Sequence, residues 1–249
     1  MNLHTAIGMV SSIAMLMPIL VILALRLFSH RTFIALLVYY LLVSIQTMMN
    51  LNMISVEKNT SQALGIVDNL LDAPLMLVFM TLFSTSARMT KRLITTALAF
   101  AAFELIVLGF TGFTVDAVRI VLGPDVIIVT GLSFVFFLRN VKLAVMNSKA
   151  MGKAIMSCSV LVSYTIFCLV YIFYYLVKNL QYRHDAQLIF YLVSILAAML
   201  MAIGILIENK RIKKLGELKH TRKELAIIYG DSSMNGFKSD SRLAGSNTN

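Results

Sequence analysis

The sequence has few charged residues, two cysteines and no tryptophan. Charged residues make up 14% of the 249 residues, against about 25% in a typical soluble chain, whereas 59% are hydrophobic and the mean hydropathy is +0.83. This shortage of charge leaves almost nothing for a water-soluble domain. Cys158 and Cys168 fall ten residues apart in one apolar run, too far apart along a helix to form a disulfide bond with each other.

Signatures of catalysis are also missing. The histidines lie outside the apolar runs and far apart in the sequence, so no cluster of metal ligands and no catalytic histidine is visible. There is no glycine-rich phosphate-binding loop and no nucleophile elbow. The sequence therefore predicts neither an enzyme nor a metal site. The histidines are His4, His30, His184 and His220.

Seven apolar runs follow one another along the chain. Each is about 20 residues or longer, the length that a helix needs to cross a hydrocarbon core about 30 Å thick. The runs are too long for the strands of a membrane barrel, which need about 10 alternating residues. We therefore predict an all-α, multi-pass integral protein of the plasma or inner membrane, in which residues 1–208 form a seven-helix transmembrane bundle. The predicted spans are 6–28, 32–54, 65–87, 92–113, 117–138, 152–177 and 186–208.

The basic residues fall almost entirely on one side of these spans. Sixteen of the 22 lysines and arginines lie in every second gap or after the last span, and only Lys58, Arg119, Lys178 and Arg183 lie on the other side. Because basic residues are retained on the cytoplasmic side, this pattern predicts an external N-terminus and a cytoplasmic C-terminus. The net charge of +10 is thus explained by topology, with the lipid bilayer as the partner and no nucleic-acid binding.

The C-terminal region changes character twice. Residues 209–229 are rich in lysine, arginine and glutamate, and predict a basic amphipathic cytoplasmic segment. Two interpretations are open: a solvated flank that stops translocation, or a surface that binds anionic lipid or a cytoplasmic protein partner. Residues 230–249 contain too few apolar side chains to form a core and are predicted to be disordered.

Four acidic residues fall inside the predicted spans, where ionisable groups are costly and mark candidate sites. Asp68 and Asp72 are four residues apart and share one helical face, so the two carboxylates are not expected to be ionised together. With Gln46 and Asn50 they predict an ion or proton site near the outer side; Asn52 is a further amide at this depth. The alternative is that both acids form hydrogen bonds between helices.

The other two intramembrane acids are Glu104 and Asp125. Asp125 follows Gly123 and Pro124, which are expected to loosen the helix locally and to free a carbonyl group. For both acids the sequence favours an interhelical hydrogen bond over a role in transport.

The segment DNLLDAPLMLVF, from Asp68 to Phe79, resembles the third-helix signature of the microbial rhodopsins. That family has an Asp, an aromatic residue, two apolar residues, two small polar residues, and then a Pro with a run of Leu. The number of spans, the external N-terminus and the chain length also fit. The resemblance implies that Asp68 takes the place of the retinal counter-ion, and that Asp72 lies where sodium-pumping members carry an Asp.

The sequence departs from that family at the pigment itself. The family attaches retinal to a lysine in helix seven, but no lysine occurs between Lys178 and Lys210. Counting back from Gly204, Leu200 falls at the lysine position and Leu196 at a second counter-ion position. Tryptophans that enclose retinal are missing as well: Asn69 takes the place of one, and Tyr171 or a nearby aromatic residue takes the place of another. These departures predict no covalent retinal, no other cofactor and no light-driven pumping.

Three functions agree with this pattern. The first is a rhodopsin-like membrane sensor, signalling protein or scaffold without pigment that acts through residues 209–229, with a homo-oligomer as an open alternative. The second is a proton or cation transporter or channel using Asp68 and Asp72, although residues 75–79 that follow are wholly apolar. The third is noncovalent binding of retinal, a carotenoid or a lipid, in a pocket formed by Asn69, Tyr171, Leu196 and Leu200.

Overall fold

The computed structural model describes residues 3–29, 31–51, 53–84, 86–147, 150–173 and 180–229. The chain divides into two compact units, Met1–Glu208 and Asn209–Asn249. The tail predicted to be disordered, 230–249, lies outside the described residues, as do Asn52 and Lys178. The helices are α1 (Leu3–Ala24), η1 (Leu27–Ser29), α2 (Arg31–Asn50), α3 (Lys58–Met80), η2 (Thr81–Phe83), α4 (Ala87–Thr111), α5 (Val115–Asn147), α6 (Met151–Tyr171) and α7 (Leu180–Tyr229).

Seven of the described helices are long and apolar enough to cross a membrane. Many of their large apolar side chains point away from the bundle: Phe110 on α4 is 87% exposed, and Ile127 on α5 is 70% exposed. Such surfaces are unfavourable in water and are stable when lipid covers them. The prediction of an all-helical, multi-pass membrane protein is confirmed at this level.

The helix boundaries differ from the predicted spans: α5 and α7 extend beyond their predicted ends, to Asn147 and Tyr229, and α3 is shifted toward the N-terminus. This helix begins at Lys58 and ends at Met80, so it lies earlier in the chain than the predicted span 65–87. The prediction overran because the chain stays apolar or small up to Ala87, whereas Ser84 and Ser86 bond to nearby backbone groups. The Ser84 hydroxyl donates to the Ser86 carbonyl at 2.9 Å, and the Ser86 Oγ accepts from the Met89 N–H at 3.3 Å, which caps α4.

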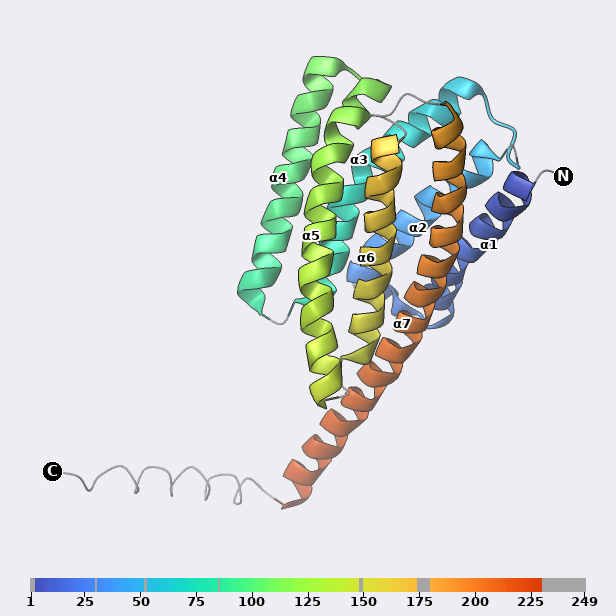
Figure 1. The fold of residues 1–249 in the computed structure, drawn as a ribbon. Helices are drawn as coiled ribbons and strands as arrows, with labels where there is room; N and C mark the ends of the chain where they lie inside the picture. Colours follow the sequence, from blue (N-terminus) through green and yellow to red (C-terminus); the bar gives the residue numbers. More distant parts are fainter. Residues whose placement is uncertain are drawn as a thin grey trace. The chain divides into compact units, whose positions relative to one another are not determined.

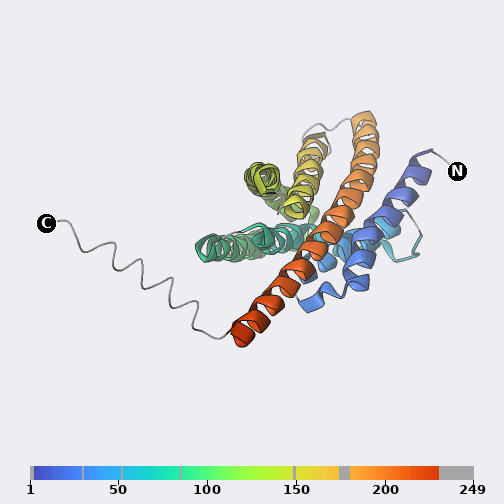
Figure 2. The same cartoon turned by 90° about the horizontal axis from the view of Figure 1, so that it is seen from below.

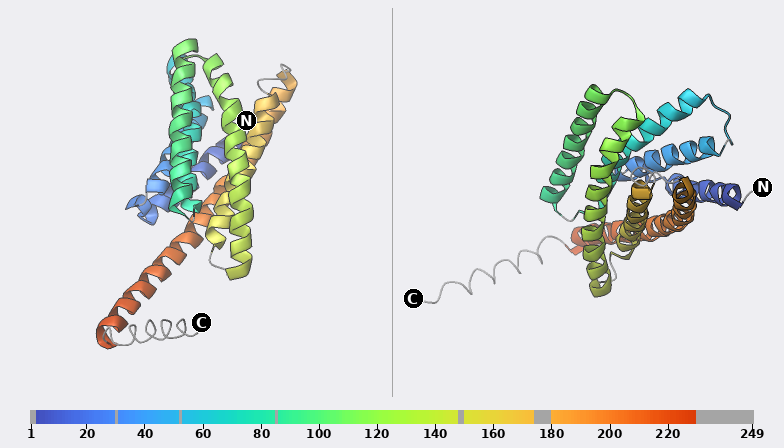
Figure 3. Two further views of the ribbon diagram at one scale, coloured as in Figure 1. Left: turned by 90° about the vertical axis from the view of Figure 1, so that its left-hand side faces the viewer. Right: turned by 45° about the horizontal axis from the view of Figure 1, so that its top comes forward.

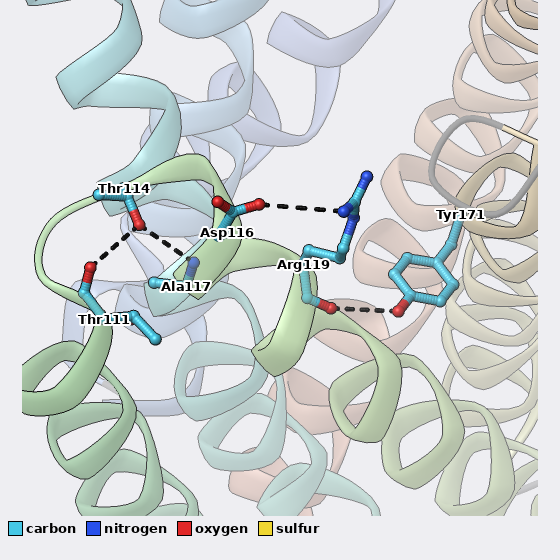
Figure 4. A network of polar contacts seen from close by, with 6 residues as sticks. All are labelled: Thr111, Thr114, Asp116, Ala117, Arg119 and Tyr171. Carbon is cyan, nitrogen blue, oxygen red and sulfur yellow. Dashed lines mark hydrogen bonds and ion pairs between the residues drawn. The ribbon is translucent and has the colours of Figure 1, made fainter. Parts of the chain in front are cut away.

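A glycine ends α4 and allows the chain to turn into α5. Gly112 has φ +72° and ψ −176°, a conformation essentially restricted to glycine, and its N–H donates to the Leu108 carbonyl at 2.9 Å. The Thr114 Oγ1 then accepts from the Ala117 N–H at 3.4 Å and satisfies one free donor at the start of α5. Figure 4 shows this turn with the residues that follow it.

Helix α3 lies at the centre of the first unit, in contact with α2, α4 and α5. Figure 1 shows α4 at one edge of the bundle and α1 at the opposite edge, and the right-hand view of Figure 3 agrees. Helices α5 and α6 pack along each other, and Figure 2 shows α6 beside α7. The edge position of α4 explains why only 28% of its most apolar stretch of 18 residues is buried, the lowest value among the seven helices.

Helices α6 and α7 approach each other closely because two glycines lie at their contact. A Cβ on Gly152 would come within 2.7 Å of the Glu208 backbone nitrogen, and one on Gly204 within 3.0 Å of the Met156 backbone nitrogen. The Ser159 hydroxyl also donates to the Ala197 carbonyl of α7 at 2.7 Å. Small residues and interhelical hydrogen bonds of this kind stabilise helix pairs in membranes, where no hydrophobic effect acts between helices.

Candidate functional site

A cavity of about 190 Å³ lies inside the first unit, between α1, α2, α3, α6 and α7. It has room for several water molecules. Its lining combines apolar side chains such as Met15, Val43 and Met76 with a set of polar ones. The polar lining residues are Tyr39, Tyr40, Gln46, Thr47, Asn50, Asp68, Asn69, Asp72, Ser159, Ser163, Tyr164 and Ser194.

Both acids of α3 line this cavity. Asp68 is half-buried, whereas Asp72, one helical turn further along, is only 8% exposed. The Tyr164 hydroxyl of α6 donates to Asp72 Oδ1 at 2.5 Å, and both side chains are buried. This bond fixes the Asp72 carboxyl against α6, so its position is determined by two helices at once.

The predicted amides meet the acids at the same cavity. Gln46 Nε2 donates to Asn50 Oδ1 at 3.4 Å on α2, and both residues line the cavity beside Asp68. Asn69 Nδ2 instead donates to the Gly65 carbonyl within its own helix at 2.6 Å. Gln46 Oε1 is buried and has no hydrogen-bond partner among the described residues, so it remains a free acceptor in the cavity wall.

Two further buried acids, Asp125 on α5 and Glu104 on α4, lie on helices that pack against α3. Asp125 is completely buried and Glu104 is 6% exposed. The Asp125 carboxyl interacts electrostatically with those of Asp72 and Glu104. However, neither Asp125 oxygen makes a hydrogen bond of normal geometry with any residue that the structure describes, and Glu104 Oε1 also lacks one. The Asp72 and Asp125 carboxyls are nevertheless close enough to share a hydrogen bond between α3 and α5, so the interhelical hydrogen bond stays a prediction for Asp125, as it does for Glu104.

No basic residue lies at the depth of these acids. Lysine and arginine are absent from residues 1–25, 32–57, 59–87, 93–118, 120–138, 154–177 and 184–209. The middle of every apolar helix therefore carries acidic or neutral side chains only. Charge on the carboxyls of this bundle must be neutralised by a proton or by a cation that is not part of the chain.

The residues predicted to form an apolar ligand pocket are only partly brought together. Asn69 lines the cavity, but Leu196 is 52% exposed and Leu200, although partly buried, does not line it. The α7 residues that do line it include Ala197 and Met201, each one position further along. One residue corresponds to about 100° of rotation about a helix, so the cavity is lined by a face of α7 about 100° away from the predicted one.

Tyr171 lies at the end of α6, away from the cavity lining. Its hydroxyl donates to the Arg119 backbone carbonyl of α5 at 3.1 Å, and the Arg119 guanidinium lies 3.9 Å from the Asp116 carboxylate (Figure 4). Tyr171 therefore joins α5 to α6. The aromatic residues of α6 that face the cavity are Phe167 and Tyr164, one and two helical turns earlier.

Five aromatic side chains of the cavity wall were not among the predicted site residues. The Tyr164 and Phe167 rings are edge to face with centroids 6.2 Å apart, and Phe167 and Phe190 of α7 are 6.3 Å apart. Tyr39 and Tyr40 contribute from α2, with centroids 5.3 Å apart. The spacing of Val160, Ser163, Tyr164 and Phe167 marks one face of a helix and is the signal from which part of this wall could have been predicted.

Beyond Asp72 the bundle is closed by packed aromatic rings. Phe79 and Phe83 are 5.3 Å apart, Phe83 and Phe136 of α5 are 5.8 Å apart, and none of the three is more than 1% exposed. The Lys153 ammonium of α6 donates to the Leu82 carbonyl of η2 and holds this end in place. We call Phe79, Phe83 and Phe136 the aromatic floor.

The described residues hold no group of three or more His, Cys, Asp or Glu side chains arranged to bind a metal ion. The carboxyl, amide and phenol groups that line the cavity are able to bind a proton, a cation or a small polar ligand. Comparisons with protein-family models, curated proteins and solved structures found no match for this chain. The microbial rhodopsin resemblance thus stays a prediction from the third helix.

Proposed function

We propose that this protein is a membrane sensor that binds a small monovalent cation or a proton in the bundle cavity, and that it carries no covalent pigment. With the N-terminus outside, as the basic residues predict, Asp68 lies on the external side of Asp72. The cation would then be taken up from outside. The rhodopsin-like third helix would have kept its acids after the loss of the retinal-binding lysine.

The observation that carries this proposal is the location of Asp68 and Asp72 in the wall of one cavity, in a bundle without lysine or arginine at their depth. Carboxyls in hydrocarbon surroundings are costly unless they are neutralised. A cation in the cavity would satisfy both acids and the free Gln46 oxygen. Cation binding is therefore the simplest account of this set of side chains.

The aromatic floor favours a sensor over a transporter. A conduit needs polar groups on both sides of its binding site, but Leu77, Phe79 and Phe83 are each at most 1% exposed. Transport would require these side chains to separate. A sensor needs only a change in helix packing, and α7, which lines the cavity through Ala197 and Met201, is also the helix that includes residues 209–229.

The cavity volume argues against a large apolar ligand. Pockets for drug-sized molecules usually measure about 300–1,000 Å³, whereas this one measures about 190 Å³. Retinal or a carotenoid would need the helices to separate first. A small polar occupant fits without that change.

The test compares the cation response of the native protein with that of two variants. In detergent, increasing sodium or potassium chloride should raise the thermal unfolding temperature, because a ligand that binds only the folded state stabilises it. Asp72→Asn should abolish the increase. Asp116→Asn, the same chemical change at a side chain that is 82% exposed, should retain it. Equal responses from all three proteins would contradict the proposal.

Liposomes containing the protein separate sensing from transport. A sensor should leave a proton or sodium gradient intact. Dissipation of either gradient that Asp72→Asn prevents would instead establish a transporter that uses the same acids.

A further inference from the structure

We propose that the preferred occupant of the cavity is a small organic ammonium ion, held by Asp68 and Asp72 and by the aromatic wall that α6 and α7 build beside them. This inference rests on the proposed cation site and names its ligand class. The aromatic side chains beside the acids point to this class, because a site for an alkali cation would not need them.

The aromatic wall starts at the acid itself. Tyr164 donates to Asp72 at 2.5 Å, its ring meets Phe167, and Phe167 meets Phe190, with centroid separations of 6.2 and 6.3 Å. All three rings line the cavity. An ion held at Asp72 therefore lies at the beginning of a continuous row of rings that runs from α6 to α7.

This combination suits an alkylated ammonium group better than a bare metal ion. A sodium ion prefers a shell of oxygen atoms, whereas an alkylammonium carries its charge on a group with apolar methyl or methylene faces. Aromatic faces attract such a group electrostatically and also cover its apolar surface. Carboxylates supply the opposite charge, and the absence of lysine and arginine at this depth leaves no competing internal cation.

The dimensions and the remaining lining agree with a small ligand of this class. About 190 Å³ is enough for a compact ammonium compound and too little for a drug-sized ligand. Gln46 Oε1, buried and without a hydrogen-bond partner among the described residues, offers an acceptor for an N–H or O–H of the ligand. Met76 and Met201 provide polarisable, adaptable walls for its carbon atoms.

The experiment uses choline as the probe and 3,3-dimethylbutan-1-ol, which has the same shape without the charge, as its neutral counterpart. Binding to the full-length protein in detergent is measured by isothermal titration calorimetry and by the shift in unfolding temperature. Choline should bind and stabilise, whereas the alcohol should do neither at the same concentration. Sodium chloride at equal ionic strength should stabilise less than choline chloride.

Two variants separate the contribution of the charge from that of the rings. Asp72→Asn should weaken choline binding at least about tenfold, and Phe167→Leu, which keeps the side chain apolar, should weaken it about fivefold. Phe103→Leu is the matched control. Phe103 is partly buried, packs with Phe100 at 5.7 Å, and does not line the cavity, so choline binding should be unchanged. Circular dichroism and size exclusion establish that each variant is folded.

The outcomes distinguish this inference from the proposed cation site. If the alcohol binds as well as choline, or if Phe167→Leu and Phe103→Leu bind choline alike, the organic ammonium assignment is overturned. The cation site would survive that result if sodium still stabilised the native protein and not Asp72→Asn. If Asp72→Asn alters no cation response at all, both fail.

Discussion

Asp125 offers the sharpest test of how this bundle accommodates a buried acid beside another acid. The side chain is completely buried, faces the carboxyls of Asp72 and Glu104, and makes no hydrogen bond of normal geometry with a described residue. Asp125→Asn has almost the same shape, removes a group that can become negative, and adds an N–H₂ donor beside the Asp72 carboxyl. We expect the variant to be more stable than the native protein.

The expected gain in stability lies between the cost of an unpaired buried polar atom and the small contribution of a hydrogen bond between membrane helices. A buried polar atom that lacks a partner costs about 1–3 kcal/mol. Hydrogen bonds between helices in a membrane contribute only ~0.6 kcal/mol on average and ~1.7 kcal/mol at most, because the unfolded state also finds partners there. A gain of about 1 kcal/mol in the free energy of unfolding is therefore expected for Asp125→Asn.

The measurement is reversible unfolding in detergent micelles, followed by far-ultraviolet circular dichroism. Asp116→Asn on the same helix is the control, because its side chain is 82% exposed, and its unfolding free energy should barely change. A loss of stability in Asp125→Asn of ~0.5 kcal/mol or more would refute the reasoning. It would mean that the native carboxyl makes a favourable interaction that the amide cannot replace.

Three further substitutions test the packing. Gly112→Ala should lower the free energy of unfolding by about 1–3 kcal/mol, because φ +72° is strained for any residue with a Cβ, even though nothing lies within 4 Å. Gly109→Ala, within α4, is the control and should be neutral or slightly stabilising in the same unfolding assay. Gly152→Ala should lower the free energy of unfolding by about 1–3 kcal/mol, because its Cβ would clash with the α7 backbone. Gly131→Ala is the control, because its Cβ would meet nothing within 4 Å. Equal unfolding temperatures for the two variants would contradict the tight contact. Tyr164→Phe should lower the unfolding free energy by ~1 kcal/mol through loss of the bond to Asp72, and an unchanged value would show that this bond adds no net stability.

The number and class of the helices followed from the sequence because both depend on run length and hydropathy. The ends of the helices did not, since hydropathy reports which residues suit lipid and not where hydrogen bonding stops. α3 is helical from Lys58 onward, through polar residues that a hydropathy window excludes. It ends at Met80, the short helix η2 follows, and the Ser84 and Ser86 hydroxyls then bond to the backbone before α4 begins.

The candidate site could be predicted where it depends on one helix and not where it depends on several. The spacing of Asp68 and Asp72 was enough to place both on one face, and both line the cavity. The position of Met201 depends on how α7 is rotated against its neighbours, which the sequence of a single helix does not report. Likewise, only the packing of α4 and α5 against α3 brings Asp125 into the electrostatic range of Asp72.

The close approach of α6 and α7 has a consequence for how the volume of the cavity can change. Glycines at the crossing and a hydrogen bond from Ser159 to α7 hold these two helices in close contact, so we expect them to move as one unit. One wall of the cavity belongs to these two helices and the facing wall belongs to α2 and α3, which pack on each other. We therefore expect a change in the volume of the cavity to move α6 and the part of α7 up to Glu208 together, against α2 and α3.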